Sequence, residues 1–197
     1  MKRGRMEAFS DGVIAILITI MVLELKTPGG HEWSDLKPVI PIALGYLISF
    51  VYVAIYWNNH HHMLQKVQHV GGGVLWANNH LLFWLSLVPF ATAWVTESGF
   101  AQVPMMLYGV VLLAAGVAYF ILAQTLVKVH GTESDFSTSL GKDVKGITSV
   151  AMYAVAILLC LVSTLLAGIL YLAVAIMWLI PDRRFAKDTY LTAHEDH

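Results

Sequence analysis

Apolar residues fall into long stretches along this chain, and short groups rich in glycine, proline or charge separate them. The clearest breaks are Pro28-Gly29-Gly30, Gly71-Gly72-Gly73 and Glu97-Ser98-Gly99. A helix needs about 20 residues to cross a hydrocarbon core of about 30 Å, and backbone polar groups inside that core need partners. The pattern therefore predicts membrane-spanning helices at about residues 6–25, 39–65, 74–96 and 103–128.

The last apolar block, from Ile147 to Ile180, is harder to divide, because it is too long for one span and slightly short for two. Two tightly connected spans fit it better, at about residues 143–166 and 169–186, with the connection near Ala167-Gly168. The chain is then expected to be one domain, residues 1–197, of an all-α membrane protein with six transmembrane helices.

Basic residues divide unevenly between the two ends of these six spans. One end has only Lys26 and Lys37, and the other has ten basic residues. Because cytoplasmic loops are enriched in Lys and Arg, both termini are expected in the cytoplasm. A five-span arrangement would move the last three of these residues outside and is disfavoured. The ten are Lys2, Arg3, Arg5, Lys66, Lys128, Lys142, Lys145, Arg183, Arg184 and Lys187.

Composition agrees with a membrane protein. Apolar residues make up 57% of the chain and charged residues 13%, with a mean hydropathy of +0.67, against about 25% charged residues in a typical soluble domain. The net charge of -1 gives no field that would attract nucleic acid, so no nucleic-acid partner is expected. Cys160 is alone, which excludes a disulfide within one chain.

The first span has distinct faces. At about 100° per residue, four side chains form one stripe, and Asp11 lies about 140° around the helix from Ile16, a member of that stripe. Periodicity alone leaves open whether the stripe contacts lipid, packs in a core or lines a pore. The stripe consists of Ile16, Thr19, Ile20 and Leu23.

Asp11 needs a partner, because an ionisable group at membrane depth costs about 2.5 to 3.5 kcal/mol on insertion scales. Arg5 is poorly placed to pair with it along one helix. A partner on another helix or in another subunit is one solution, and water at the cytoplasmic interface is another.

A second polar group closes the second span, in the segment YWNNHHH. Trp57, His60 and His61 share a helical face, and an indole or imidazole N–H suits a carboxylate. The three consecutive histidines, His60 to His62, fan too widely around a helix to bind one metal ion, so no metal site is expected. No nucleophile or phosphate-loop motif occurs either, and we do not expect an enzyme.

Arg5, Phe9, Ser10 and Asp11 form the pattern R-x-x-x-F-S-D, which resembles the transmembrane protein 175 family of potassium channels in its prokaryotic single-repeat form. The end of the second span and segments 87–92 and 180–184 fit the same family. The resemblance implies a homotetramer in a prokaryotic plasma membrane, with monovalent cations passing through a central pore lined by the first helix.

The resemblance also implies roles for individual residues. Ile16 would form the hydrophobic constriction, Thr19 a hydroxyl layer favouring potassium, and Ile20 and Leu23 further apolar layers. No backbone-carbonyl filter is expected, and the sequence has no T-V-G-Y-G. A structural network behind the pore would comprise Arg5, Phe9, Ser10, Asp11, Trp57, His60 and His61, with the choice among the three histidines open.

These observations predict a potassium-permeable channel with modest selectivity over sodium and no cofactor besides the permeant K⁺. Two other classes stay open. One is a proton-coupled membrane transporter that uses Asp11 and the cluster His60 to His62. The other is a membrane protein that carries a metal or haem.

Overall fold

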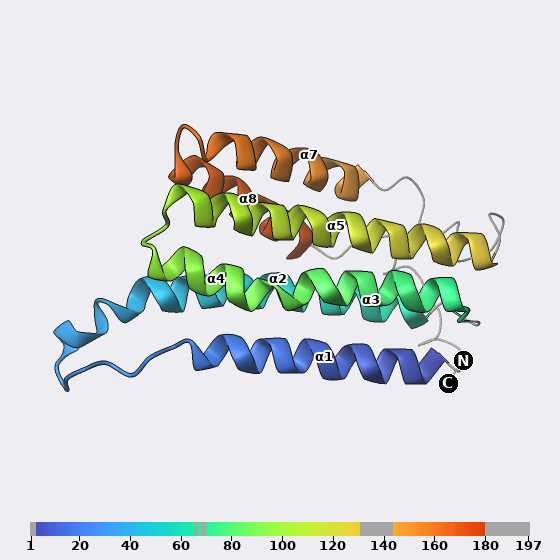
Figure 1. Cartoon of the computed structure of the whole chain (residues 1–197), viewed down its shortest axis with the longest axis horizontal. Helices are drawn as coiled ribbons and strands as arrows, with labels where there is room; N and C mark the ends of the chain where they lie inside the picture. Colours follow the sequence, from blue (N-terminus) through green and yellow to red (C-terminus); the bar gives the residue numbers. More distant parts are fainter. Residues whose placement is uncertain (1–2, 66, 68–69, 131–143, 180–197) are drawn as a thin grey trace, which may run out of the picture.

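The computed structural model describes residues 3–65, 67, 70–130 and 144–179, and these residues form an all-helical bundle. The helices run roughly along its long axis, with α8 crossing obliquely (Figure 1). In chain order they are α1 (Arg3–Leu23), the short 3₁₀ helix η1 (Trp33–Leu36), α2 (Val39–Gln65), α3 (Gly72–Ser86), α4 (Val88–Glu97), α5 (Gln102–His130), α7 (Val144–Leu159) and α8 (Thr164–Leu179).

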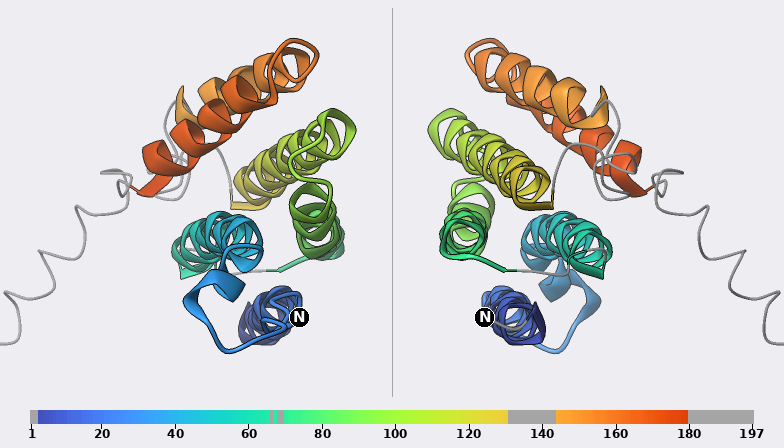
Figure 2. Two further views of the ribbon diagram at one scale, coloured as in Figure 1. Left: turned by 90° about the vertical axis from the view of Figure 1, so that its left-hand side faces the viewer. Right: turned by 90° about the vertical axis from the view of Figure 1, so that its right-hand side faces the viewer.

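The bundle is layered, and α1 lies at one edge. Seen along the long axis, α2 and the α3–α4 pair come next, then α5, and the α7–α8 hairpin forms the opposite edge (Figure 2). Accordingly α1 packs against α2, α3 and α4, whereas α5 packs against α3, α4 and α7. One side of α1 therefore has no neighbour in the described part of the subunit.

Length and composition allow four helical stretches to cross a membrane: α1, α2, the combined stretch Gly72–Glu97, and α5. The apolar helices α7 and α8 are shorter, with 16 residues each. The expected all-α protein with six apolar helical segments is thus confirmed for the residues described here. Residues 131–143, between α5 and α7, and residues 180–197 lie outside those described.

The third expected span, 74–96, is broken at Leu87, where α3 ends and α4 begins. Pro89 in the first turn of α4 explains the break, because it has no N–H to donate to the carbonyl four residues earlier. Proline is well tolerated in a first turn, so the chain continues as a second helix in nearly the same direction (Figure 1).

The connection between the last two helices differs from the expected one. It lies at residues 160–163, not near Ala167-Gly168, so α7 and α8 replace the expected ranges 143–166 and 169–186. Ser163 explains the position, because its hydroxyl accepts a hydrogen bond from the Leu166 N–H at 3.4 Å, as a helix N-cap does. Ala167 is buried inside α8. Residues 180–186 lie outside the described chain.

Hydroxyl groups and one glycine hold the middle of the bundle together. Ser49 on α2 is hydrogen-bonded to Thr92 on α4 at 2.7 Å and to Tyr108 on α5 at 3.0 Å. One turn before Ser49, a Cβ on Gly45 would overlap the Thr96 methyl group. Glycine at this position is what allows α2 and α4 to approach so closely.

Candidate functional site

The two faces of α1 differ in what covers them. The buried side chains recur every three or four residues and face α2, α3 and α4, as expected for one side of an α-helix. This face is apolar except for one hydroxyl. Its members are Met6, Ser10, Ile14, Leu17 and Met21.

The opposite face of α1 carries the stripe expected from the sequence. Ile16 is 58% exposed, Ile20 43% and Leu23 78%, and Thr19 is exposed between them. The Thr19 hydroxyl donates to the Ile16 carbonyl at 2.8 Å. Because its hydrogen is used within the helix, the hydroxyl oxygen keeps lone pairs for an outside ligand.

Asp11 lies at the boundary between the two faces, and its partner comes from α2. The Trp57 indole N–H donates to Asp11 Oδ1 at 2.9 Å. The Trp57 ring also stacks on His61, with ring centroids 5.7 Å apart and planes 18° from parallel. The partly buried Asp11 carboxylate thus receives a hydrogen bond from a neighbouring helix. This bond offsets part of the cost of placing an ionisable group at membrane depth.

A further polar group ties the start of α1 to the end of α2. The Glu7 carboxylate lies 3.2 Å from His61 Nδ1 and 3.8 Å from Arg3 Nε. Arg3 also donates to the Gln65 carbonyl at 2.8 Å. These contacts hold both helices together at the end of the bundle where α1 begins (Figure 1).

His60 takes part in a separate hydrogen-bonded chain through three helices. The Ser10 hydroxyl donates to the Met6 carbonyl at 2.8 Å and accepts from Asn78 Nδ2 at 2.9 Å. The amide oxygen of Asn78 then faces His60 Nε2 at 2.7 Å. Since an amide oxygen only accepts, His60 carries its proton on Nε2. The chain joins α1, α3 and α2.

Asn78 is a member of this chain that the sequence reasoning missed. A signal for it exists, because Val74, Ala77, Leu81 and Leu85 share the buried face of α3 with Asn78. A polar residue in phase with an apolar stripe requires a buried partner. His60 Nδ1 is buried and has no hydrogen-bond partner among the atoms described.

Two residues expected in the network lie elsewhere. Phe9 is 58% exposed and Arg5 is also exposed, and both lie on the same face of α1 as Ile16. Neither has a hydrogen bond or ion pair to Asp11 or Trp57 in the part of the chain that the structure describes. The structure therefore brings together Asp11 with Trp57 and Ser10 with His60, and leaves Arg5 and Phe9 outside.

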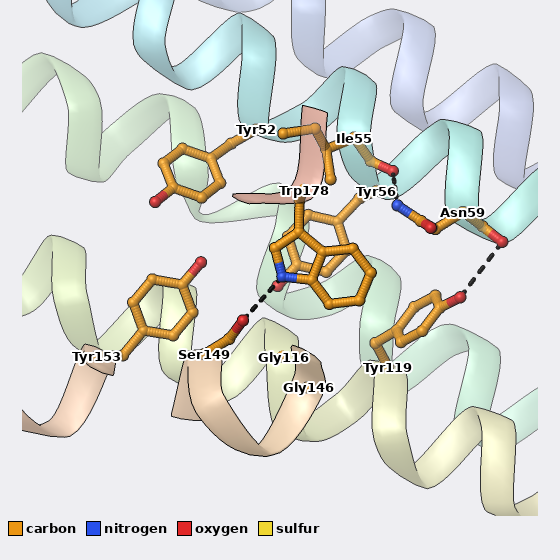
Figure 3. A pocket seen from close by; sticks show the side chains of 10 residues that line it. All are labelled: Tyr52, Ile55, Tyr56, Asn59, Gly116, Tyr119, Gly146, Ser149, Tyr153 and Trp178. Carbon is orange, nitrogen blue, oxygen red and sulfur yellow. Dashed lines mark hydrogen bonds between the residues drawn. The ribbon is translucent and has the colours of Figure 1, made fainter. Parts of the chain in front are cut away.

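The described residues contain no group of three or more His, Cys, Asp and Glu side chains arranged to hold a metal ion. A small cavity of about 50 Å³ does lie between α2, α5, α7 and α8. Aromatic rings line it, and among them the Trp178 indole donates to the Ser149 hydroxyl at 2.8 Å (Figure 3). No residue of α1 lines this cavity, so it is separate from the stripe.

A bundle of long apolar helices with one uncovered apolar face identifies a multi-pass membrane protein. Residues 5–89 match the family model described as endosomal/lysosomal potassium channel TMEM175. A potassium channel of Chryseobacterium sp. (strain P1-3) is 48% identical over 95% of this chain and 97% of its own length. The chain belongs to the TMEM175 family, a family of potassium channels and not of enzymes.

Two further proteins show the same relationship. A potassium channel of Streptomyces collinus (strain DSM 40733 / Tue 365) is 34% identical over 59% of this chain and 60% of its own length. The crystal structure of a lysosomal potassium-selective channel TMEM175 homolog from Chamaesiphon minutus superimposes with a TM-score of 0.74 at 29% identity. That superposition covers 90% of this chain and 96% of the other, so the likeness extends over the whole bundle.

Proposed function

We propose that this protein is a potassium-permeable channel in which four copies of the chain surround a pore lined by the exposed face of α1. Relatives that are named as potassium channels support potassium as the permeant ion. The observation that carries the proposal is the asymmetry of α1. Polar contacts fix one side of this helix to its own subunit, while the other side presents an uncovered apolar stripe with one hydroxyl layer.

Ile16 forms the constriction in this proposal. Four isoleucine side chains around an axis make a narrow apolar ring, and such a ring stops ions by excluding water when narrow and passes them when wider. Ile20 and Leu23 continue the apolar lining for about 10 Å along the helix axis. The exposure of all three side chains in one subunit supports this arrangement.

Thr19 supplies the selectivity. Its oxygen keeps free lone pairs because its hydrogen is bonded to the Ile16 carbonyl. Four such oxygens replace part of the hydration shell of a cation, and potassium releases its water more readily than sodium does. One hydroxyl layer has far fewer ligands than a stack of carbonyl rings, so the preference for potassium is modest.

The polar groups behind α1 set the position of the pore-lining face. Trp57 holds Asp11, and Asn78 links Ser10 to His60, so α1 is fixed in rotation against α2 and α3. A rotation of even one residue would turn Ile16 away from the axis by about 100°. These residues therefore act as positioning residues and do not touch the ion.

In the membrane, both termini face the cytoplasm of a prokaryotic cell, because ten of the twelve Lys and Arg residues in the sequence fall on the N-terminal side of the six expected spans. The expected partners are three further copies of the chain, the surrounding lipid and monovalent cations. The only bound species that this function needs is the permeant K⁺.

Single-channel recording of the purified protein in planar bilayers tests the proposal. Ile16→Asn should raise open probability or leak, and Thr19→Ala should lower the permeability ratio of potassium to sodium. Ser86→Ala is a matched control, because Ser86 is exposed on α3 and donates to the Phe83 carbonyl at 2.7 Å. The control should leave selectivity unchanged.

Unchanged currents in both α1 variants would remove this helix from the pore. A proton-coupled transporter would instead give saturable, pH-driven flux without unitary current steps. A carrier of metal or haem would copurify with its ligand and show it in an absorbance spectrum or elemental analysis.

A further inference from the structure

Arg5 lies on the face of α1 that we assign to the pore, not in the polar network behind it. Roughly three helical turns, about 16 Å along the axis, separate it from Ile16. Phe9 lies between them on the same face and is 58% exposed. The exposed face is therefore continuous from Leu23 to Arg5, near the first residue of α1.

The charge of Arg5 is not compensated within the described part of the subunit. The carboxylates at this end of α1 are engaged by other groups: Glu7 by Arg3 and His61, and Asp11 by Trp57. Arg3 shows the contrast, because it points toward α2 and donates to a backbone carbonyl there. Two arginines two residues apart thus have different surroundings.

We propose that the four Arg5 side chains form a ring of positive charge at the N-terminal entrance of the pore, and that this ring limits the current of cations entering from that side. The inference rests on the proposed function, since it needs four copies of α1 around one axis. A ring of like charge at a pore mouth changes the local concentration of permeant ions. Arg5 is then a residue that sets conductance.

The size of the effect follows from Coulomb's law with salt screening. Four unit charges, each about 10 Å from the axis in water, lower the local cation concentration about threefold at 0.1 M salt. At 1 M salt the screening length falls to about 3 Å and the effect disappears. Salt dependence therefore distinguishes a charge effect from a change in packing.

The test is single-channel current in symmetrical KCl, measured for the wild type and for Arg5→Gln. At 0.1 M, Arg5→Gln should raise the current entering from the N-terminal side about threefold, and at 1 M the two proteins should agree. Arg5→Lys keeps the charge and should behave like the wild type. Arg3→Gln is the matched control, because it removes an arginine from the same helix end on the other face, and its current should stay unchanged.

A second measurement uses the wild type alone and compares the currents from the two sides of the membrane. Its current from the N-terminal side should be smaller than its current from the other side at 0.1 M, and the difference should vanish at 1 M. Wild-type currents that are equal from the two sides at 0.1 M as well as at 1 M would overturn the inference. So would an Arg5→Gln effect that persists at 1 M, or an equal effect of Arg3→Gln. If the protein carries no potassium current at all, the proposed function is wrong. If Ile16→Asn alters the current but the salt concentration changes neither the effect of Arg5→Gln nor the difference between the two sides, only the Arg5 ring is wrong.

Discussion

Asn78 offers the sharpest test of how α1 is held in place. It is buried on α3, accepts from His60 Nε2 at 2.7 Å and donates to the Ser10 hydroxyl at 2.9 Å. Asn78→Leu removes both hydrogen bonds and keeps a side chain of similar size. Ser10 retains its bond to the Met6 carbonyl. His60 is left with a buried N–H and no acceptor.

A buried donor without a partner costs about 1–3 kcal/mol. In double-mutant cycles, hydrogen bonds between membrane helices average about 0.6 kcal/mol of coupling, with a maximum of about 1.7 kcal/mol. This is the range expected for the coupling between His60 and Asn78. Asn78→Leu should therefore lower the free energy of unfolding by about 1–3 kcal/mol. His60→Leu combined with Asn78→Leu should cost less than the sum of the two single variants, because neither side then leaves an unpaired polar group.

The assay is unfolding of the purified protein by SDS in mixed micelles, for the wild type, both single variants and the double variant. Asn79→Leu is the matched control, since Asn79 is the exposed neighbour of Asn78 on the same helix, and its stability should change little. Strict additivity of the two single variants would refute the hydrogen bond between His60 and Asn78 as a support of α1.

Three further changes test other parts of the structure. Trp57→Phe removes the indole N–H that donates to Asp11, so the free energy of unfolding in SDS should fall by about 1.5–3 kcal/mol. Single-channel conductance should stay the same. A changed conductance at unchanged stability would contradict the positioning role. Gly45→Ala should reduce the yield of folded protein in size-exclusion chromatography, because the added Cβ overlaps the Thr96 methyl group. Adding Thr96→Ser, which removes that methyl group, should restore the yield. A full yield of Gly45→Ala alone would refute the close approach of α2 and α4. Ser163→Ala should cost about 0.5–2 kcal/mol through the lost helix cap, and no change in unfolding would argue against capping.

The helical periodicity of α1 was readable from the sequence. Ile16, Thr19 and Leu23 were expected to share a face, and the structure leaves that face uncovered. Periodicity succeeds here because side chains separated by three or four residues in a helix necessarily lie together. Periodicity does not reveal what covers a face, because that depends on the other helices and on neighbouring subunits.

The family resemblance groups Arg5 and Phe9 with Asp11 and Trp57; within one subunit they do not contact these residues, so their place in the network stays a prediction. A shared motif groups residues by their order in the chain, whereas contact depends on the direction of each side chain. In R-x-x-x-F-S-D, Phe9, Ser10 and Asp11 follow one another directly and point to different sides of the helix, so Ser10 is buried while Phe9 is exposed. The same helical geometry applied to every motif residue would have separated them.

The turn between α7 and α8 shows a different limit. Apolar length alone favoured a connection near Ala167-Gly168, because glycine commonly marks a break. Ser163-Thr164 was the better signal, since a hydroxyl residue before an apolar run marks a helix start. In this chain the capping residue Ser163, and not Gly168, marks the start of α8.

Single-channel recording in opposing potassium and sodium gradients, with wild type and Ile16→Asn side by side, shows whether α1 lines a potassium pore. We expect unitary currents that reverse toward the potassium equilibrium potential in the wild type, and an increased open probability or leak in Ile16→Asn. Unitary currents that Ile16→Asn leaves unchanged would contradict this expectation, as would a flux without unitary steps.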